Sequence, residues 1–268
     1  MPRTPKTIDR RRALYASTAW LIGPLLPMNS VLARALIDET DPNIAELAET
    51  LVRGRATPRE RAVAIHDYVR DQVRFGFAPH FYAMSAADVL AAGVGYCNTK
   101  STLFMALLRA AGIDARQQFV DLDATIWRGL LDLRTPYIDH SYVEVLLGGA
   151  WIATDSYAVD APLVRASQAA LRAEGRRCGY GVRVDGRIDW DGRVPSFMQF
   201  APAFSRHRWG VFSDIADFYA SVPEAWNQRS DAMRVIFPLA ALTANQAAEM
   251  LRTNGASAVR SGKWQLRS

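Results

Sequence analysis

The segment 99–111 constrains the fold more than any other part of the sequence. Its residues, TKSTLFMALLRAA, would be apolar on most sides of a helix, and Gly112 follows as a C-terminal cap. A helix with this pattern must be covered by other elements, so the segment predicts a core helix. A glycine loop, GVGYC, precedes it and places Cys97 at the junction of loop and helix.

Three helices are predicted upstream of the core helix. The first begins at Pro42 and stops at Gly54. The second follows Thr57, a capping residue with Glu60 three positions later. The third is short and ends at Gly93. The core helix therefore has several helical segments available to cover it.

Downstream of the core helix, the apolar period changes from 3.6 residues towards 2. Runs at 115–122, 141–147 and 151–154 are rich in β-branched and aromatic residues and are separated by turn signals, which predicts an antiparallel sheet. Helices followed by strands indicate an α+β fold. Residues 167–174, 213–220 and 240–252 predict helices, so the last part of the chain is mostly helical. Residues 175–193 predict a small hairpin.

These patterns divide the chain into three parts. Residues 1–35 form a basic and apolar N-terminal segment, residues 36–160 form the α+β core, and residues 161–268 form a C-terminal extension expected to pack on the core. The net charge is +5, and residues 1–12 alone carry +4, so the rest of the chain is nearly neutral. A neutral body without basic clusters interleaved with aromatic residues predicts no nucleic-acid partner.

Residues 1–35 have the order of an export signal. Three arginines at 10–12 precede an apolar stretch over 13–26 and a small-residue tripeptide at 33–35. The arginine cluster resembles a twin-arginine signal, which would direct the protein to the periplasm. The alternative is an amphipathic arm packed on the domain of a cytoplasmic protein. The apolar stretch is too short for a stable membrane span.

Two cysteines occur, Cys97 and Cys178, and their separation fits neither a disulfide framework nor a metal site. We therefore expect no metal and no cofactor. At a helix N-terminus, unpaired backbone N–H groups and the helix dipole stabilise a thiolate, which makes Cys97 a candidate nucleophile. The alternative is a small buried apolar residue. We interpret Cys178 as incidental, and Asn98 and Lys100 as polar residues of the first helical turn.

His140 is the candidate base among four histidines. His66 lies on a predicted helix, His80 in an aromatic loop over 75–82, and His207 between two arginines that disfavour its protonation. His140, by contrast, begins an alternating strand pattern that leads to a glycine pair at 148–149. That pair predicts a two-residue hairpin turn, because both positions tolerate positive φ.

The two-residue turn places Asp155 on the same face as His140. It pairs Leu147 with Ala150, and Asp155 then lies diagonally across from His140, at about 7 Å. An imidazole and a carboxylate can bridge that separation. The alternative for Asp155 is a solvated residue at a strand end. The candidate catalytic residues are therefore Cys97 as nucleophile, His140 as general base and Asp155 as the group that orients the imidazole.

Three segments together resemble the core of the transglutaminase-like superfamily. They are TPRERAVAIHDYVRDQVRF, GVGYCNTKSTLFMALLRAAGIDAR and DHSYVEVLLGGAWIATDSY, and they cover roughly 57–157. The resemblance implies a papain-like α+β fold, in which a central Cys-bearing helix packs on an antiparallel sheet. It also implies the order Cys, His, Asp for the catalytic residues, which is the order here.

The resemblance implies acyl chemistry on an amide of a peptide or protein substrate through a thioester, either hydrolysis or acyl transfer to an amine. Nothing in the sequence resembles the calcium sites or β-domains of the animal enzymes. Tyr82 is a candidate second oxyanion donor, with an aromatic core residue as the alternative. The competing hypothesis is a catalytically silent scaffold or peptide-binding module. A thiol or metal-binding protein is disfavoured, because no clustered cysteine or histidine completes a coordination sphere.

Overall fold

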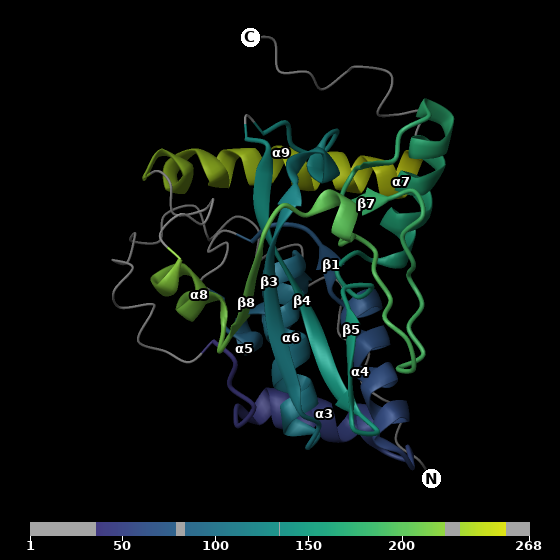
Figure 1. Cartoon of the computed structure of the whole chain (residues 1–268), viewed down its shortest axis with the longest axis vertical. Coiled ribbons are helices and arrows are strands. Elements are labelled where there is room, and N and C mark those ends of the chain that lie inside the picture. Colours follow the sequence, from purple (N-terminus) through teal and green to yellow (C-terminus); the bar gives the residue numbers. More distant parts are fainter. Residues whose placement is uncertain (1–35, 79–83, 134, 223–230, 256–268) are drawn as a thin grey trace. The chain divides into compact units, whose positions relative to one another are not determined.

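The computed structural model describes residues 36–78, 84–133, 135–222 and 231–255, with side chains after 230 described from 240 onward. All of them belong to one unit of the chain, Ala35–Ser268 (Figure 1). Its helices are α3 (Pro42–Val52), α4 (Pro58–Gln72), α5 (Ala86–Ala92), α6 (Cys97–Ala110), α7 (Ala161–Glu174), α8 (Ile215–Ser221) and α9 (Asp231–Asn254). Two 3-10 helices are η1 (Ala124–Trp127) and η2 (Pro202–Phe204). The predicted export signal lies outside the described residues.

The strands form one four-stranded sheet and two short pairs. They are β1 (Arg74–Phe75), β2 (Val94–Gly95), β3 (Ala115–Asp123), β4 (Tyr137–Leu147), β5 (Ala150–Thr154), β6 (Cys178–Gly179), β7 (Val182–Arg183) and β8 (Arg208–Phe212). The large sheet has the order β5-β4-β3-β8, and its three pairings are antiparallel. In Figure 1 these strands follow one another from β8 on the left to β5 on the right.

The register of the β4–β5 hairpin is the predicted one. Leu147 pairs with Ala150, and Gly148 and Gly149 take φ values of +63° and +83°. The turn therefore requires residues that tolerate positive φ at both positions. Strand β8, by contrast, was not predicted: it is an edge strand whose residues are all exposed or half-buried, so the sequence lacks a buried apolar alternation there.

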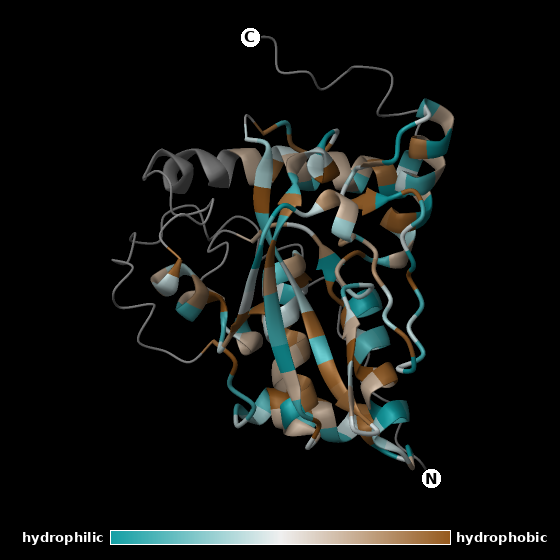
Figure 2. Cartoon of the chain, viewed as in Figure 1, coloured by the Kyte–Doolittle hydropathy of each residue, from teal (hydrophilic) through white to brown (hydrophobic). Residues whose placement is uncertain are grey.

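Helix α6 is the predicted core helix. Its residues from Cys97 to Leu108 are all buried, and it packs against α3, α4 and α5 as well as against β3 and β4. Three alternate residues of β4 lie in the same buried hydrophobic cluster as the apolar residues of α6: Val143, Val145 and Leu147. Figure 2 shows this mixture of hydrophobic and hydrophilic residues along the strands of the sheet. The predicted α+β fold, with a central Cys-bearing helix on an antiparallel sheet, is confirmed.

Capping residues set where several helices begin. In α4, Thr57 Oγ1 accepts from the N–H of Glu60 at 3.2 Å, and the Glu60 carboxylate accepts from the N–H of Thr57 at 3.0 Å, as the capping box predicts. Helix α7 begins earlier than the predicted 167, because Asp160 caps it by accepting from the N–H of Leu163. Helix α9 likewise begins before the predicted 240.

Helix α9 of the extension holds the segment around β1 in place. The side-chain amide of Asn245 exchanges two 2.8 Å hydrogen bonds with the backbone of Phe77. Arg252 pairs with Asp160 in a buried ion pair and also donates to the carbonyl oxygen of Phe75 at 2.7 Å. Among the described residues, no helix is both long and apolar enough to cross a membrane.

Candidate active site

The candidate nucleophile, Cys97, is the first residue of α6, as the sequence predicted for a cysteine at a helix N-terminus. It is a free cysteine and only 2% exposed. The loop before it passes close to the first turn of the helix: a Cβ on Gly95 would lie 2.8 Å from Thr99 Oγ1 and 3.0 Å from Lys100 Cγ. Glycine is therefore required for the loop to deliver Cys97 to this position.

His140 and Asp155 meet as the hairpin register predicted. The Nε2–H of His140 donates to Asp155 Oδ2 at 3.0 Å, and both side chains are almost completely buried. Since the carboxylate can only accept, the hydrogen bond places the ring proton on Nε2. The other ring nitrogen, Nδ1, then carries the lone pair of the neutral ring.

Three backbone N–H groups from the C-terminal extension hold the Asp155 carboxylate. Gln199 donates to both carboxylate oxygens, at 3.2 and 3.3 Å, Phe200 donates to Oδ2 at 2.7 Å, and Met198 donates to Oδ1. The segment is anchored next to the end of β5 by a parallel bridge between Thr154 and Ser196. The sequence did not predict these donors, because every residue except proline has a backbone N–H group.

Cys97 interacts with the ring of His140. Burial of the ring disfavours its charged form, but the charge and proximity of Cys97 and the hydrogen bond to Asp155 outweigh it and raise the pKa of His140 to about 9. Nε2 is already bonded to Asp155, and the buried Nδ1 has no partner at good hydrogen-bond geometry among the described residues. Nδ1 is therefore the ring nitrogen available to the thiol.

Polar side chains tie the first turn of α6 to the sheet. Ser101 Oγ donates to the carbonyl oxygen of Cys97 at 2.7 Å and lies 2.6 Å from the hydroxyl of Tyr157. Ser141 on β4 donates to Ser101 Oγ at 3.3 Å and accepts from Gln117 on β3 at 2.8 Å. All these side chains are buried, so the network fixes the helix relative to the strand that carries His140.

Lys100 anchors the same turn on the other side. Its Nζ donates to the carbonyl oxygen of Val73 at 2.7 Å, just beyond the end of α4, and lies 3.5 Å from that of Arg70. The residue is fully buried, and burial lowers the pKa of its ammonium group to about 7. Lys100, which the sequence suggested was no more than a polar first-turn residue, is therefore a buried structural contact.

Aromatic residues surround the nucleophile. Phe77, Tyr96 and Trp127 belong to the same buried cluster as Cys97, with the ring centroids of Phe77 and Trp127 5.0 Å apart and those of Phe77 and Tyr96 5.4 Å apart. Tyr82, the candidate second oxyanion donor, lies outside the described residues, as does His80.

The remaining described histidines are engaged elsewhere. His66 is buried, with Nδ1 2.9 Å from Asp67 Oδ1 and Nε2 2.7 Å from Ser156 Oγ, and burial lowers the pKa of its ring. The ring of His207 lies against Trp209, with centroids 4.0 Å apart. Neither is in a position comparable to that of His140. Cys178, interpreted as incidental, is buried and 3.2 Å from Thr125 Oγ1.

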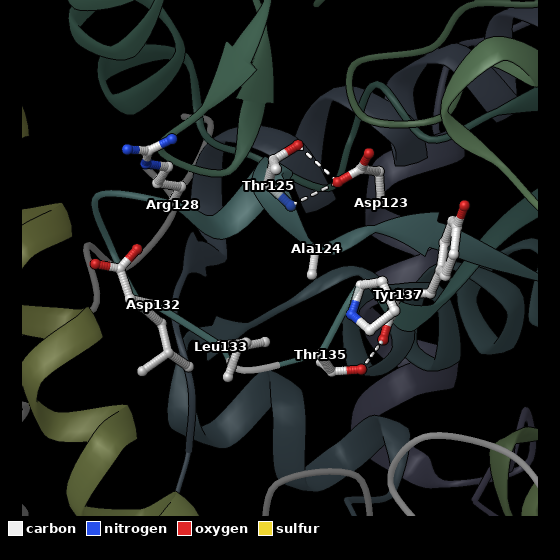
Figure 3. A pocket seen from close by; sticks show the side chains of 10 residues that line it. Asp123, Ala124, Thr125, Arg128, Asp132, Leu133, Thr135 and Tyr137 are labelled. Carbon is white, nitrogen blue, oxygen red and sulfur yellow. Dashed lines mark hydrogen bonds between the residues drawn. The ribbon is translucent and has the colours of Figure 1, made fainter.

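A pocket of about 310 Å³ lies where β3 ends and β4 begins (Figure 3). Asp123, Arg128, Asp132 and Tyr137 are among the residues that line it, whereas Cys97, His140 and Asp155 are not. In Figure 3, Asp123 is bonded to Thr125, through the backbone N–H at 2.9 Å and the hydroxyl at 2.7 Å. Across the described ranges, no group of three or more His, Cys, Asp or Glu side chains could hold a metal ion.

Comparisons with known proteins identify the core. Residues 45–156 match the family model of the Transglutaminase-like superfamily, a segment that contains Cys97, His140 and Asp155. The search of curated proteins gave no match.

Two solved structures are similar to part of the chain. One is described as a "Putative Cysteine Protease" from Cytophaga hutchinsonii, with 23% identity over 47% of this chain and a TM-score of 0.37. The other is described as a "putative protease" from Parabacteroides distasonis, with 18% identity over 46% of this chain and a TM-score of 0.34. The matches span 40% and 25% of those two chains. Residues 45–156 of the chain therefore match the core of the transglutaminase-like superfamily, as the sequence predicted.

Proposed function

We propose that this protein is a cysteine-dependent enzyme that acts on an amide of a peptide or protein through a thioester on Cys97. The observation that supports the proposal is the placement of the two ring nitrogens of His140. One ring nitrogen is bonded to Asp155 at 3.0 Å, and the other faces Cys97, whose charge helps to raise the pKa of the ring to about 9. A nucleophile, a base and an orienting carboxylate in this order support acyl transfer.

In the proposed reaction, the thiolate of Cys97 attacks the carbonyl carbon of the amide, an S–C bond forms, and the carbonyl electron pair moves to oxygen. The His140 imidazolium then gives its Nδ1 proton to the leaving nitrogen as the C–N bond breaks, which leaves a thioester and a free amine. Water or a second amine attacks the thioester, and His140 takes its proton. The S–C bond breaks and regenerates the thiolate, with an acid or a new amide as product.

Asp155 acts on His140 and not on the substrate. Its hydrogen bond keeps Nδ1 directed at the sulfur, and its charge stabilises the imidazolium. The three N–H groups from 198–200 fix the carboxylate itself. The proposed site is thus held by the core and by the extension together.

The test is the pH dependence of iodoacetamide alkylation at Cys97, with Cys178→Ser as the background so that one thiol is read. A thiolate–imidazolium pair predicts fast alkylation well below the ordinary thiol pKa of about 8.5, and loss of that low-pH reactivity in His140→Ala. A second assay follows transfer of acetyl from p-nitrophenyl acetate to Cys97 by peptide mass spectrometry. Equal, slow alkylation of both proteins with an ordinary thiol profile contradicts the proposal.

The competing function is a catalytically silent scaffold or peptide-binding module. The 2% exposure of Cys97 and the complete burial of His140 favour it, because a substrate carbonyl must reach the sulfur. The same experiment separates the two functions. If Cys97 stays unreactive in the folded protein and reacts only after denaturation, the site is closed and the binding module is favoured. Turnover of the acetyl ester by the folded protein excludes a silent domain.

A further inference from the structure

The side-chain amide of Asn98 has one end against the nucleophile and the other end without a partner. Asn98 is fully buried, and its Oδ1 lies 3.6 Å from Cys97 Sγ as the acceptor of the thiol hydrogen. Its Nδ2 is buried and makes no hydrogen bond to any described residue. Buried amide groups are nearly always bonded, so an unpaired NH2 group beside a nucleophile requires a functional explanation.

The present orientation of the amide suits only the neutral thiol. While sulfur carries a proton, the S–H group donates to Oδ1; once sulfur is ionised, Oδ1 faces a negative atom and the bond is lost. A half-turn about the Cβ–Cγ bond exchanges the two ends, which have nearly the same shape. The half-turn breaks no hydrogen bond of Nδ2 to the described residues, and it directs an N–H donor at the sulfur.

The backbone of this turn is fixed, so the side chain is the part that can reorient. Thr102 Oγ1 donates to the carbonyl oxygen of Asn98 at 3.2 Å, and Ser101 Oγ donates to that of Cys97 at 2.7 Å. Both bonds hold carbonyl groups and leave the Asn98 amide unconstrained. The Nδ2–H group can therefore donate a hydrogen bond to the atoms that react on Cys97.

We propose that Asn98 is a catalytic residue, whose Nδ2–H group donates to the oxyanion of the tetrahedral intermediate on Cys97. The oxyanion is two bonds from the sulfur, so an amide that reaches the sulfur also reaches the oxygen. The backbone N–H groups at the start of α6, which lack partners within the helix, supply the other donors. This inference rests on the proposed acyl chemistry of Cys97, and it assigns a second oxyanion donor among the described residues.

The experiment compares two reactions of the same sulfur in the full-length protein. With p-nitrophenyl acetate, the thiolate attacks the carbonyl carbon, an S–C bond and an oxyanion form, and p-nitrophenolate leaves as the carbonyl is restored. With iodoacetamide, the thiolate displaces iodide from a CH2 group and no oxyanion develops. Loss of an oxyanion donor therefore slows acetylation without slowing alkylation of the fully ionised thiol.

The variants are Asn98→Leu, which keeps the branched shape without the amide, and Asn98→Ala. We expect the acetylation rate to fall by about 10²–10³-fold in both, while the alkylation rate at its high-pH plateau changes less than about threefold. Ser167→Ala removes a buried hydroxyl group that contacts the carbonyl oxygen of Tyr180 and serves as the control, with both rates within about threefold of wild type. Retention of the low-pH alkylation, which an unfolded chain lacks, shows that the variants are folded around Cys97.

Each other outcome overturns the inference. Acetylation of the Asn98 variants at the wild-type rate excludes the oxyanion role and leaves the proposed function intact. If the acetylation rate and the high-pH plateau rate of alkylation fall together, Asn98 acts on the thiol and not on the oxyanion. If the wild type alkylates at Cys97 but is not acetylated, the proposed acyl chemistry fails and the role of Asn98 fails with it. The wild-type result thus distinguishes the two failures.

Discussion

Replacing Cys97 by serine should lower the pKa of His140 from about 9 by more than one pH unit. The folded-state pKa of His140 lies above the 6.5 of an unperturbed histidine, although burial of the ring acts in the opposite direction. Interactions with Cys97 and Asp155 must therefore exceed the net rise. Serine keeps the size of the side chain but stays neutral, so it removes the charge that faces Nδ1.

The magnitude follows from the relative strength of these interactions. The charge of Cys97 is the largest of them, ahead of the hydrogen bond to Asp155. An opposite charge beside a titratable group shifts its pKa by about 1–3 units. Loss of the Cys97 charge is therefore expected to lower the pKa of His140 by more than about one pH unit, on the order of 1–2 kcal/mol.

The assay is an NMR titration of the His140 ring carbon and proton resonances in the wild type, Cys97→Ser and Cys178→Ser. Cys178 is the matched control, because it is also a buried free cysteine but contacts Thr125. We expect Cys178→Ser to titrate like the wild type. A His140 pKa that is the same in Cys97→Ser as in the wild type would refute the facing arrangement of Nδ1 and the thiol.

Three further predictions concern stability. Because the pKa of His140 is raised, its protonated ring stabilises the fold below about pH 6.5 by on the order of 3 kcal/mol. This contribution is lost as the pH rises through about 9. Urea unfolding of the wild type and of His140→Gln at both ends of that pH interval measures it. Arg252→Met leaves the buried carboxylate of Asp160 without its partner and should cost about 3–5 kcal/mol in the free energy of unfolding. Adding Asp160→Asn should recover part of that loss, and a double variant no more stable than Arg252→Met would contradict this reasoning. Ser156→Ala removes the 2.7 Å partner of His66 Nε2 and should destabilise the fold by about 1–3 kcal/mol in thermal unfolding, whereas an unchanged midpoint would mean that the ring nitrogen finds another donor.

The site geometry was predictable where a local rule sets the register. Two glycines fix the length of the β4–β5 turn, and a strand alternates with period 2, so the turn alone determines which residues face His140. The observed bond to Asp155 depends on that register, since a slip of one residue would reverse the face. The start of α6 was likewise set by a short pattern, a glycine loop followed by an apolar helix.

Contacts that depend on tertiary structure were not predictable. The sequence indicated only that Asn98 and Lys100 are polar residues of a first turn, yet both are fully buried, because α6 packs against α3, α4, α5 and the strands β3 and β4. Helix α7 begins at an Asp160 cap that sequence analysis overlooked, although Pro162 at its start was a usable signal. The edge strand β8 carried no comparable signal.

The family core and the proposed site do not have the same boundaries. The family match ends at residue 156, but the carboxylate of Asp155 is held by N–H groups of residues 198–200. A fully buried carboxylate needs such donors, since water cannot replace them. Asp155 in turn holds His140, so the raised pKa of the ring depends on a segment outside the family match. The extension is therefore a structural part of the proposed site, and a fragment cut at the end of the family match would leave Asp155 without the donors that fix it.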